Sequence, residues 1–266
     1  MLFAFVVLIL MVMGVLSMLV STISGGGTNV VLIPALILAF QFSPGEAVGT
    51  SFLALTAGST VAAIRFFRKG YVDLKRGSVL GASTVPGIVA GSLLSSLAEG
   101  GAFKVLLGLV VVGLAIVIAM RDRFDSDGAR VMASSTKGAS ARTLGYSVDM
   151  KLGVILFAFL GVFVGFFGQG GGLLLVPIMQ FLGFPIVAIL GTARIIALFV
   201  GSAALTTRLA ASQVNLVYGM ALAAGTMIGG FLGTEVSTTM KVGTLRIFVA
   251  LFIGLLGGLL VVESLL

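Results

Sequence analysis

The chain of 266 residues has no cysteine, no histidine and no tryptophan. Without cysteine there is no disulfide framework and no thiolate chemistry, and without histidine the commonest general base and metal ligand is missing. Charged residues are also scarce, at 9%, whereas 59% of the residues are apolar and the mean hydropathy is +1.24. This composition excludes a water-soluble domain and predicts an all-α integral membrane protein.

Acidic residues are few, nine against sixteen lysines and arginines. They fall in predicted loops or near the ends of apolar segments, so we expect no relay of carboxylates across the bilayer. An enzyme would need a nucleophile beside a base, or a pair of carboxylates, and neither is present. We therefore expect no enzymatic activity, no metal and no cofactor. The net charge of +7 does not indicate nucleic-acid binding, because the basic residues lie in short loops between apolar segments.

Much of the sequence occurs twice. The run Gly-Gly-Gly-Thr-Asn-Val-Val-Leu-Ile-Pro at 25–34 has a counterpart, Gly-Gln-Gly-Gly-Gly-Leu-Leu-Leu-Val-Pro, at 168–177. The correspondence continues through each half and pairs Thr50 with Thr192, Arg65 with Arg208, and Gly91 with Gly233. A repeated unit whose hydrophobic segments are interrupted by glycine is typical of secondary transporters.

Each half contains five apolar segments. They are expected at 2–23, 30–41, 47–67, 77–97 and 103–120, and again at 151–167, 173–183, 187–208, 216–236 and 244–263. The third, fourth and fifth segments of each half are long enough to cross the membrane, whereas 30–41 and 173–183 reach only about 16 to 18 Å. We interpret these two as half-helices that begin at the glycine runs inside the bilayer. The first segment is expected to be retained, because no positive charge and no cleavage site accompany it.

The distribution of lysine and arginine predicts the orientation. Basic residues are concentrated at 65–76 and at 121–151, which we therefore place in the cytoplasm. In the second half, the loop at 208–218 has one basic residue, and Lys241 and Arg246 lie on the next loop. The excess of lysine and arginine is therefore on the opposite set of loops from the first half. The predicted domains are a first transmembrane repeat at 1–120, a cytoplasmic polar linker at 121–150 and a second, inverted repeat at 151–266. Both termini are then outside the cell. The first two segments of each half form either full spans or re-entrant hairpins, and we favour the hairpins slightly.

The two glycine runs are the main candidate site. Backbone N–H groups at the start of a helix, together with the positive end of its dipole, favour an anion, and glycine lets a ligand approach the backbone. The alternative is that these glycines only allow close helix packing, as in most membrane bundles. The predicted substrate-binding residues from these runs are Gly25, Gly26, Gly27, Thr28, Asn29, Gln169, Gly170, Gly171 and Gly172.

Four further residues complete the predicted site. Arg194 is the charged residue that lies clearly within a predicted span, and a buried guanidinium needs a partner, which an anionic substrate would supply. The alternative is that it snorkels to the interface or bonds to backbone carbonyls. Thr50, Ser51 and Thr192 occupy corresponding positions and are expected to line the same cavity, although hydroxyls in membrane helices often bond to their own backbone.

The two glycine runs, the Ala-Val-Gly-Thr-Ser run at 47–51 and the Arg-Lys-Gly-Tyr-Val-Asp run at 68–73 resemble the TauE/SafE family of sulfite exporters. The resemblance covers nearly the whole chain. It implies a multi-pass protein of the cell inner membrane that transports small sulfur-containing oxyanions or organosulfonates. We expect export by alternating access, with a small anion and the lipid bilayer as partners. An anion channel, and a carrier for carboxylates or other small anions, remain alternatives.

Overall fold

The computed structural model describes residues 2–24, 26–97, 148–168 and 171–237. Within these ranges the protein is helical and has no strand. Its helices are α1 (Leu2–Ser24), α2 (Thr28–Phe40), α3 (Pro44–Arg68), α4 (Leu74–Leu97), α7 (Met150–Phe167), α8 (Gly171–Phe181), α9 (Ile186–Ala210) and α10 (Leu216–Val236). The predicted segments 103–120 and 244–263, and most of the linker at 121–150, lie outside the described residues, so the domain boundaries stay predictions.

Six of the described helices, α1, α3, α4, α7, α9 and α10, are long and apolar enough to cross a membrane. The two helices that begin at the glycine runs are much shorter. α2 has 13 residues and α8 has 11, so they extend about 20 and 16 Å, which confirms the prediction that both are too short to span. Large apolar side chains are exposed on the outside of the bundle, among them Phe159, Phe181 and Met220. These surfaces suit a lipid environment, and the protein is therefore a multi-pass membrane protein.

Short polar residues fix several helix ends. The Ser43 hydroxyl accepts a hydrogen bond from the Glu46 backbone N–H, and Pro44 occupies the first turn of α3. The side chains of Asp149 and Asn215 cap α7 and α10 in the same way, by accepting from Leu152 N and Tyr218 N. These caps satisfy backbone donors that a membrane interior could not. They place the ends of the long helices where the sequence is polar.

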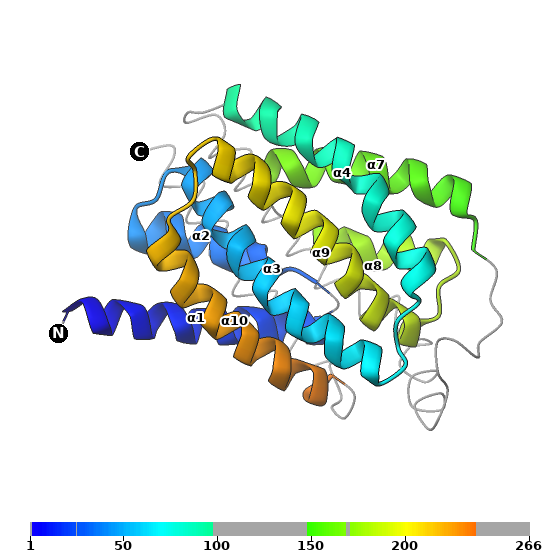
Figure 1. Ribbon diagram of the computed structural model, residues 1–266, viewed down its shortest axis with the longest axis horizontal. Coiled ribbons are helices and arrows are strands. Elements are labelled where there is room, and N and C mark those ends of the chain that lie inside the picture. Colours follow the sequence, from blue (N-terminus) through cyan, green and yellow to red (C-terminus); the bar gives the residue numbers. More distant parts are fainter. Residues whose placement is uncertain (1, 25, 98–147, 169–170, 238–266) are drawn as a thin grey trace.

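The packing of the first four helices recurs in the second four. α1 packs on α10 and α7 packs on α4, while α3 packs on α10 and α9 packs on α4, with α3 and α9 in contact between them. In Figure 1, α3 and α9 cross the centre of the molecule side by side, flanked by α10 and α4. Each half thus lays its first helix on the fourth helix of the other half, so the two halves form one bundle.

Glycines allow the outer helices of this bundle to approach closely. A Cβ atom on Gly229 of α10 would collide with the Val15 carbonyl of α1, and one on Gly87 of α4 would collide with the Ala158 carbonyl of α7. The pair Gly229 and Val15 corresponds to the pair Gly87 and Ala158 in the repeated sequence. For these glycines, close helix packing is therefore the correct interpretation.

The structure corrects the register of one part of the repeat. α3 and α9 both have 25 residues, and their burial patterns agree when Pro44 is matched with Ile186, the first residue of each helix. In this register Arg208 takes the place of Phe66, and both side chains are buried. The predicted pairing of Arg65 with Arg208 is therefore wrong by one residue. A shift of one residue turns a side chain by about 100° around the helix, which separates the half-exposed Arg65 from the buried face.

Candidate functional site

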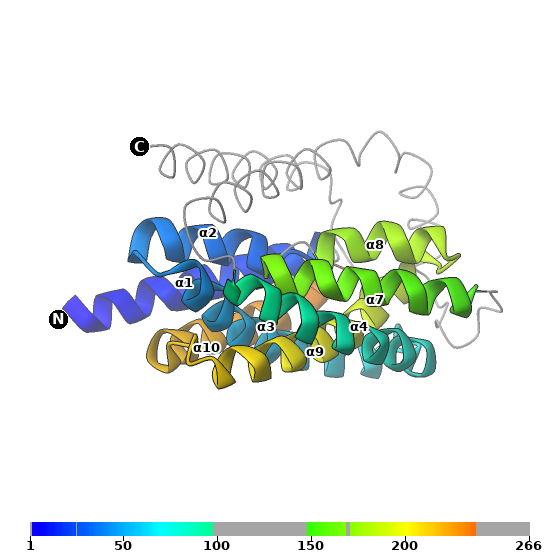
Figure 2. The same ribbon diagram turned by 90° about the horizontal axis from the view of Figure 1, so that it is seen from above.

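The first turns of α2 and α8 face each other near the middle of the molecule. Figure 2 shows the two short helices nearly end to end, each extending from the centre to an opposite end of the bundle. Gly27, the N-cap residue of α2, has φ 111°, and Gly26 before it has φ 155°. L side chains rarely adopt this region, so the backbone requires glycine here. Both helices therefore direct first-turn N–H groups and the positive ends of their dipoles to one central region.

A hydrogen bond joins the two glycine runs. Asn29 in the first turn of α2 donates from its Nδ2 to the backbone carbonyl of Gly168 at 2.8 Å. Gly168 ends α7 in the left-handed conformation, with φ 71°. The Asn29 side chain is only 5% exposed, and its Oδ1 has no hydrogen-bond partner among the described residues. The two halves thus meet at the glycine runs through a hydrogen bond between an amide side chain and a backbone carbonyl.

Arg194 lies beside the first glycine run. Its side chain is 2% exposed, and its Nη1 and Nη2 donate to the hydroxyl and the carbonyl of Ser21, at 3.2 and 2.5 Å. Ser21 belongs to the last turn of α1, directly before the glycines. Nε has no hydrogen-bond partner, and the three ion pairs found among the described residues involve other side chains. Arg194 is therefore a buried cation, neutralised by no carboxylate in the described part of the chain, at the end of the predicted anion site.

The Thr50 and Thr192 hydroxyls accept equivalent hydrogen bonds at opposite ends of the molecule. The Thr50 hydroxyl accepts from the backbone N–H of Asn215, just before α10, and the Thr192 hydroxyl accepts from that of Asp73, just before α4. Asp73 follows the C-terminal end of α3, whereas Thr50 lies near its N-terminal end, and a helix of 25 residues is about 37 Å long. The two hydroxyls therefore bind different loops, and their predicted place in one cavity stays a prediction. The Ser51 hydroxyl donates to the Val48 carbonyl of its own helix.

The remaining predicted residues are placed in part. Thr28 is buried, and its hydroxyl lies 3.5 Å from the Met18 sulfur. Gly171 and Gly172 form the start of α8. Gly25, Gln169 and Gly170 lie outside the described residues, and their predicted role stays a prediction. The structure therefore places Gly27, Thr28 and Asn29 at the start of α2 and Arg194 against the last turn of α1, while Thr50 and Thr192 bind the loops before α10 and α4.

A family model described as "Sulfite exporter TauE/SafE" matches residues 10–260. The chain belongs to this family. The TauE/SafE resemblance seen in the glycine runs is thereby confirmed. The protein is a membrane transporter of the family, which agrees with the expectation that it is not an enzyme.

Several curated relatives of this TauE/SafE chain bear the name "Probable membrane transporter protein". The YunE protein of Bacillus subtilis (strain 168) is 25% identical over 266 residues, which cover 96% of this chain and 97% of the relative. A protein of Haemophilus influenzae (strain ATCC 51907 / DSM 11121 / KW20 / Rd) is 24% identical over 87% of this chain and 85% of its own length. A protein of Xylella fastidiosa (strain Temecula1 / ATCC 700964) is 27% identical over 82% of this chain and 79% of its own length. No solved structure matches the chain.

Sequence reasoning missed two parts of this TauE/SafE transporter's polar interior. Ser21 gives no signal, because serines in apolar helices are common and usually bond to their own backbone. Arg208 is a second buried arginine within α9 and is 2% exposed, whereas the sequence predicts it at the end of a span. It donates to Gln213 Oε1 at 2.7 Å, to Ser95 Oγ at 2.9 Å and to the Gly165 carbonyl at 3.2 Å. The packing of α4 and α7 beside α9 supplies Ser95 and Gly165, and Gln213 follows α9 in the loop before α10.

Proposed function

We propose that this transporter is a carrier that exports a small sulfur-containing anion, sulfite or an organosulfonate, by alternating access. The observation that carries the proposal is the meeting of the first turns of α2 and α8 beside a buried, un-neutralised Arg194. Helix N-termini stabilise anions through free N–H groups and the dipole. A guanidinium binds oxyanions through its planar fork. The two helix N-termini and the Arg194 guanidinium together give a positive potential in the interior of the bundle, where a charge is otherwise costly.

The binding of an anion would complete the hydrogen bonding of the site. Arg194 uses one N–H of Nη1 and one of Nη2 for Ser21, so the Nε–H and the second N–H of each Nη remain for substrate oxygens. Buried arginine is costly unless it is paired, and a mobile anion supplies the pairing during part of the cycle. Glycine at 26 and 27, which have no side chain, lets a small ligand approach the backbone closely. The Asn29 amide holds the opposite glycine run in place.

The repeated packing supports an inverted relation between the halves. Each half contributes α3 or α9 to the centre and lays its first helix on the other half, the arrangement expected if a pseudo-two-fold axis passes between α3 and α9. We propose that the loop at 69–73 faces the cytoplasm with its basic neighbours and that the loop at 211–215 faces outward. In this orientation the linker at 121–150 is cytoplasmic, both termini are outside and the protein resides in the inner membrane. Rocking of the halves about the central contact would then alternate access.

The test is ligand-dependent thermal stability of the purified protein in detergent. A ligand that binds only the folded protein raises the melting temperature by mass action. We expect a selective rise with sulfite, thiosulfate or sulfoacetate, and no rise with a neutral solute. Arg194→Ala and Arg194→Lys should both lose the rise, since neither retains the fork. Ser21→Ala is the matched control, because it removes a hydroxyl bonded to Arg194 but leaves the guanidinium.

The outcomes separate the claims of this proposal. Retention of the full ligand shift in a folded Arg194→Ala protein would remove this arginine from the site. A shift with carboxylates and none with sulfur anions would replace the substrate class. Flux in proteoliposomes then separates a carrier from a channel, because a carrier saturates and shows counterflow, whereas a channel does not.

A further inference from the structure

A pocket of about 360 Å³ opens on the outside of the bundle where the last turns of α3 lie against α10, far from the central site. Its wall combines apolar and cationic side chains: Val61, Ile64, Arg65, Arg68, Lys69 and Phe231. Three of the six are basic, which is unusual in a chain with only 9% charged residues. None of these side chains belongs to the proposed transport site.

The pocket is built mainly from one face of α3. Positions 61, 64, 65 and 68 recur at the helical spacing of three and four residues, so their side chains form one stripe. The stripe changes character along the helix, from Val61 and Ile64 to the arginines in the last turn. Ile64 is 49% exposed and Phe231, on the opposite wall, is 51% exposed. An apolar surface therefore runs directly into a cationic one at the helix end.

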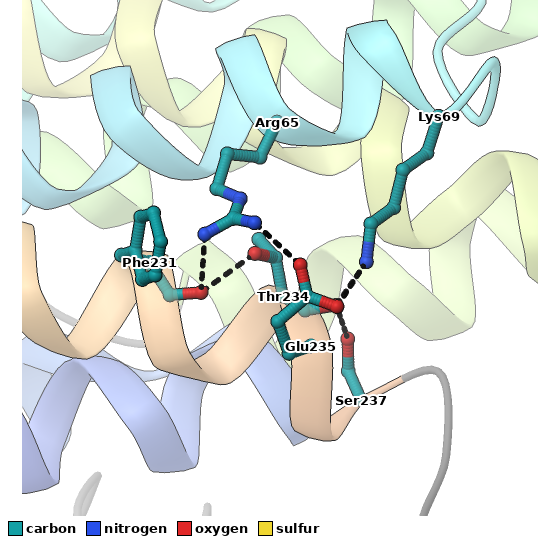
Figure 3. A network of polar contacts seen from close by, with 6 residues as sticks. All are labelled: Arg65, Lys69, Phe231, Thr234, Glu235 and Ser237. Atoms are coloured by element: carbon teal, nitrogen blue, oxygen red, sulfur yellow. Dashed lines mark hydrogen bonds and ion pairs between the residues drawn. The ribbon is translucent and has the colours of Figure 1, made fainter.

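Two of the three cations are held in place by α10. Arg65 donates to the Phe231 carbonyl at 3.4 Å, stacks 3.6 Å from the centre of the Phe231 ring and pairs with Glu235. Lys69 donates to Glu235 at 3.0 Å and to the Thr234 carbonyl at 3.2 Å. Figure 3 shows both cations converging on this one carboxylate. One carboxylate cannot balance three cations.

Arg68 provides the charge that remains. Its side chain is exposed, and it has no hydrogen bond or ion pair among the described residues. It follows Ile64 by one helical turn, so an aliphatic chain lying on Ile64 would end beside its guanidinium. The fixed pair of Arg65 and Lys69 borders the same opening. The pocket thus offers a phosphate group at least one bidentate donor.

The fold alone does not require this charge. α9 ends as α3 does, yet its last turn has Thr206, Thr207 and Ala210 where α3 has Ile64, Arg65 and Arg68. The corresponding positions on α4 are Val89 and Leu93, where α10 has Phe231 and Glu235. The positions that correspond to the pocket wall therefore carry no charge at the other end of the molecule, where Arg208 of α9 is buried. The basic pocket is an addition to one end of a repeated framework.

We infer that this pocket binds an anionic glycerophospholipid, with the phosphate against Arg68 and Lys69 and an acyl chain along Ile64 and Phe231. Phosphates lie at the boundary between hydrocarbon and water, which is where the stripe changes from apolar to basic. Basic pockets between transmembrane helices are suited to anionic headgroups. The inference is independent of the transported substrate.

The absence of tryptophan makes this inference directly measurable. Phe231→Trp places a single fluorophore in the pocket wall and keeps an aromatic ring beneath Arg65. The full chain is reconstituted in bilayers, and quenching by brominated phosphatidylglycerol is compared with quenching by brominated phosphatidylcholine. We expect the anionic lipid to be preferred at least about fivefold, the contribution of one basic residue near the surface. Phe159→Trp on α7, where the side chain is 72% exposed, is the control and should show no preference.

A second pair of variants tests the role of charge. In the Phe231→Trp background, Arg68→Gln should lower the preference for phosphatidylglycerol about fivefold, whereas Lys75→Gln, an exposed lysine at the same end but outside the pocket, should preserve it. Both residues are exposed, so both variants should fold with unchanged melting temperatures. Equal quenching by the two lipids, or an equal loss from both variants, would overturn the inference. Relief of quenching by soluble glycerol 3-phosphate would also overturn it and identify a site for soluble anions.

Discussion

Arg194 and Arg208 lie on the same helix, both 2% exposed, but their environments differ. Arg208 contacts the Gln213 and Ser95 side chains and the Gly165 carbonyl. Arg194 forms its hydrogen bonds with a single residue, Ser21, among the described residues, and the Nε of each arginine has no hydrogen-bond partner there. Burial of arginine is costly in both cases, so the less satisfied one is the better candidate for function. The sequence predicts Arg194 as this candidate. Its hydrogen bond to the Ser21 carbonyl agrees with the alternative interpretation, in which this arginine bonds to backbone carbonyls.

At the same scale, Asn29 is expected to stabilise the junction of the two glycine runs. Asn29→Ala leaves the Gly168 carbonyl without its amide donor, and an unsatisfied buried group costs about 1 to 3 kcal/mol. We expect a lower melting temperature in detergent. Thr60→Ala, at an exposed position where the hydroxyl bonds to its own helix, should change it little. Equal stability of both variants would mean that the Asn29 contact does not hold the halves together.

At the scale of the elements, helix length and glycine position decide the architecture. The short helices α2 and α8 were predicted from the sequence because hydrophobic length is a local property. Local sequence properties do not predict which helices pack against the glycines of α4 and α10. Their partners, α7 and α1, lie in the other half, and only the structure shows which carbonyls approach them.

This packing predicts the effect of adding volume to α10. Gly229→Val would place a side chain against the Val15 carbonyl and separate α1 from α10, at a cost of about 1 to 3 kcal/mol. Gly87→Val should have a similar effect on α4 and α7. The melting temperature in detergent measures both, with Ile228→Val on the exposed side of α10 as the control. If Gly229→Val is as stable as this control, α1 and α10 do not pack through that glycine.

At the scale of the whole molecule, the repeated packing leads to a prediction about topology. The chain has no cysteine, so single substitutions give a clean labelling assay. Lys75→Cys and Ala211→Cys introduce thiols at exposed positions beside the loops that precede α4 and α10. We expect a membrane-impermeant maleimide to label Ala211→Cys in intact cells, and to label Lys75→Cys only after the membrane is opened. Labelling of both from the same side would refute the inverted arrangement.

The sequence by itself determined the membrane class, the repeat, the two half-helices and the family, since hydropathy, glycine spacing and motif order are properties of the chain read along its length. Only the tertiary structure decided which residues meet. It placed Arg194 on Ser21 and Asn29 on Gly168, and it separated Thr50 from Thr192. It also matched Arg208 with Phe66 and not with Arg65. Equivalent positions on two helices share the same burial, whatever the residue type. These contacts join the two halves of the chain, and no local pattern fixes how such halves dock.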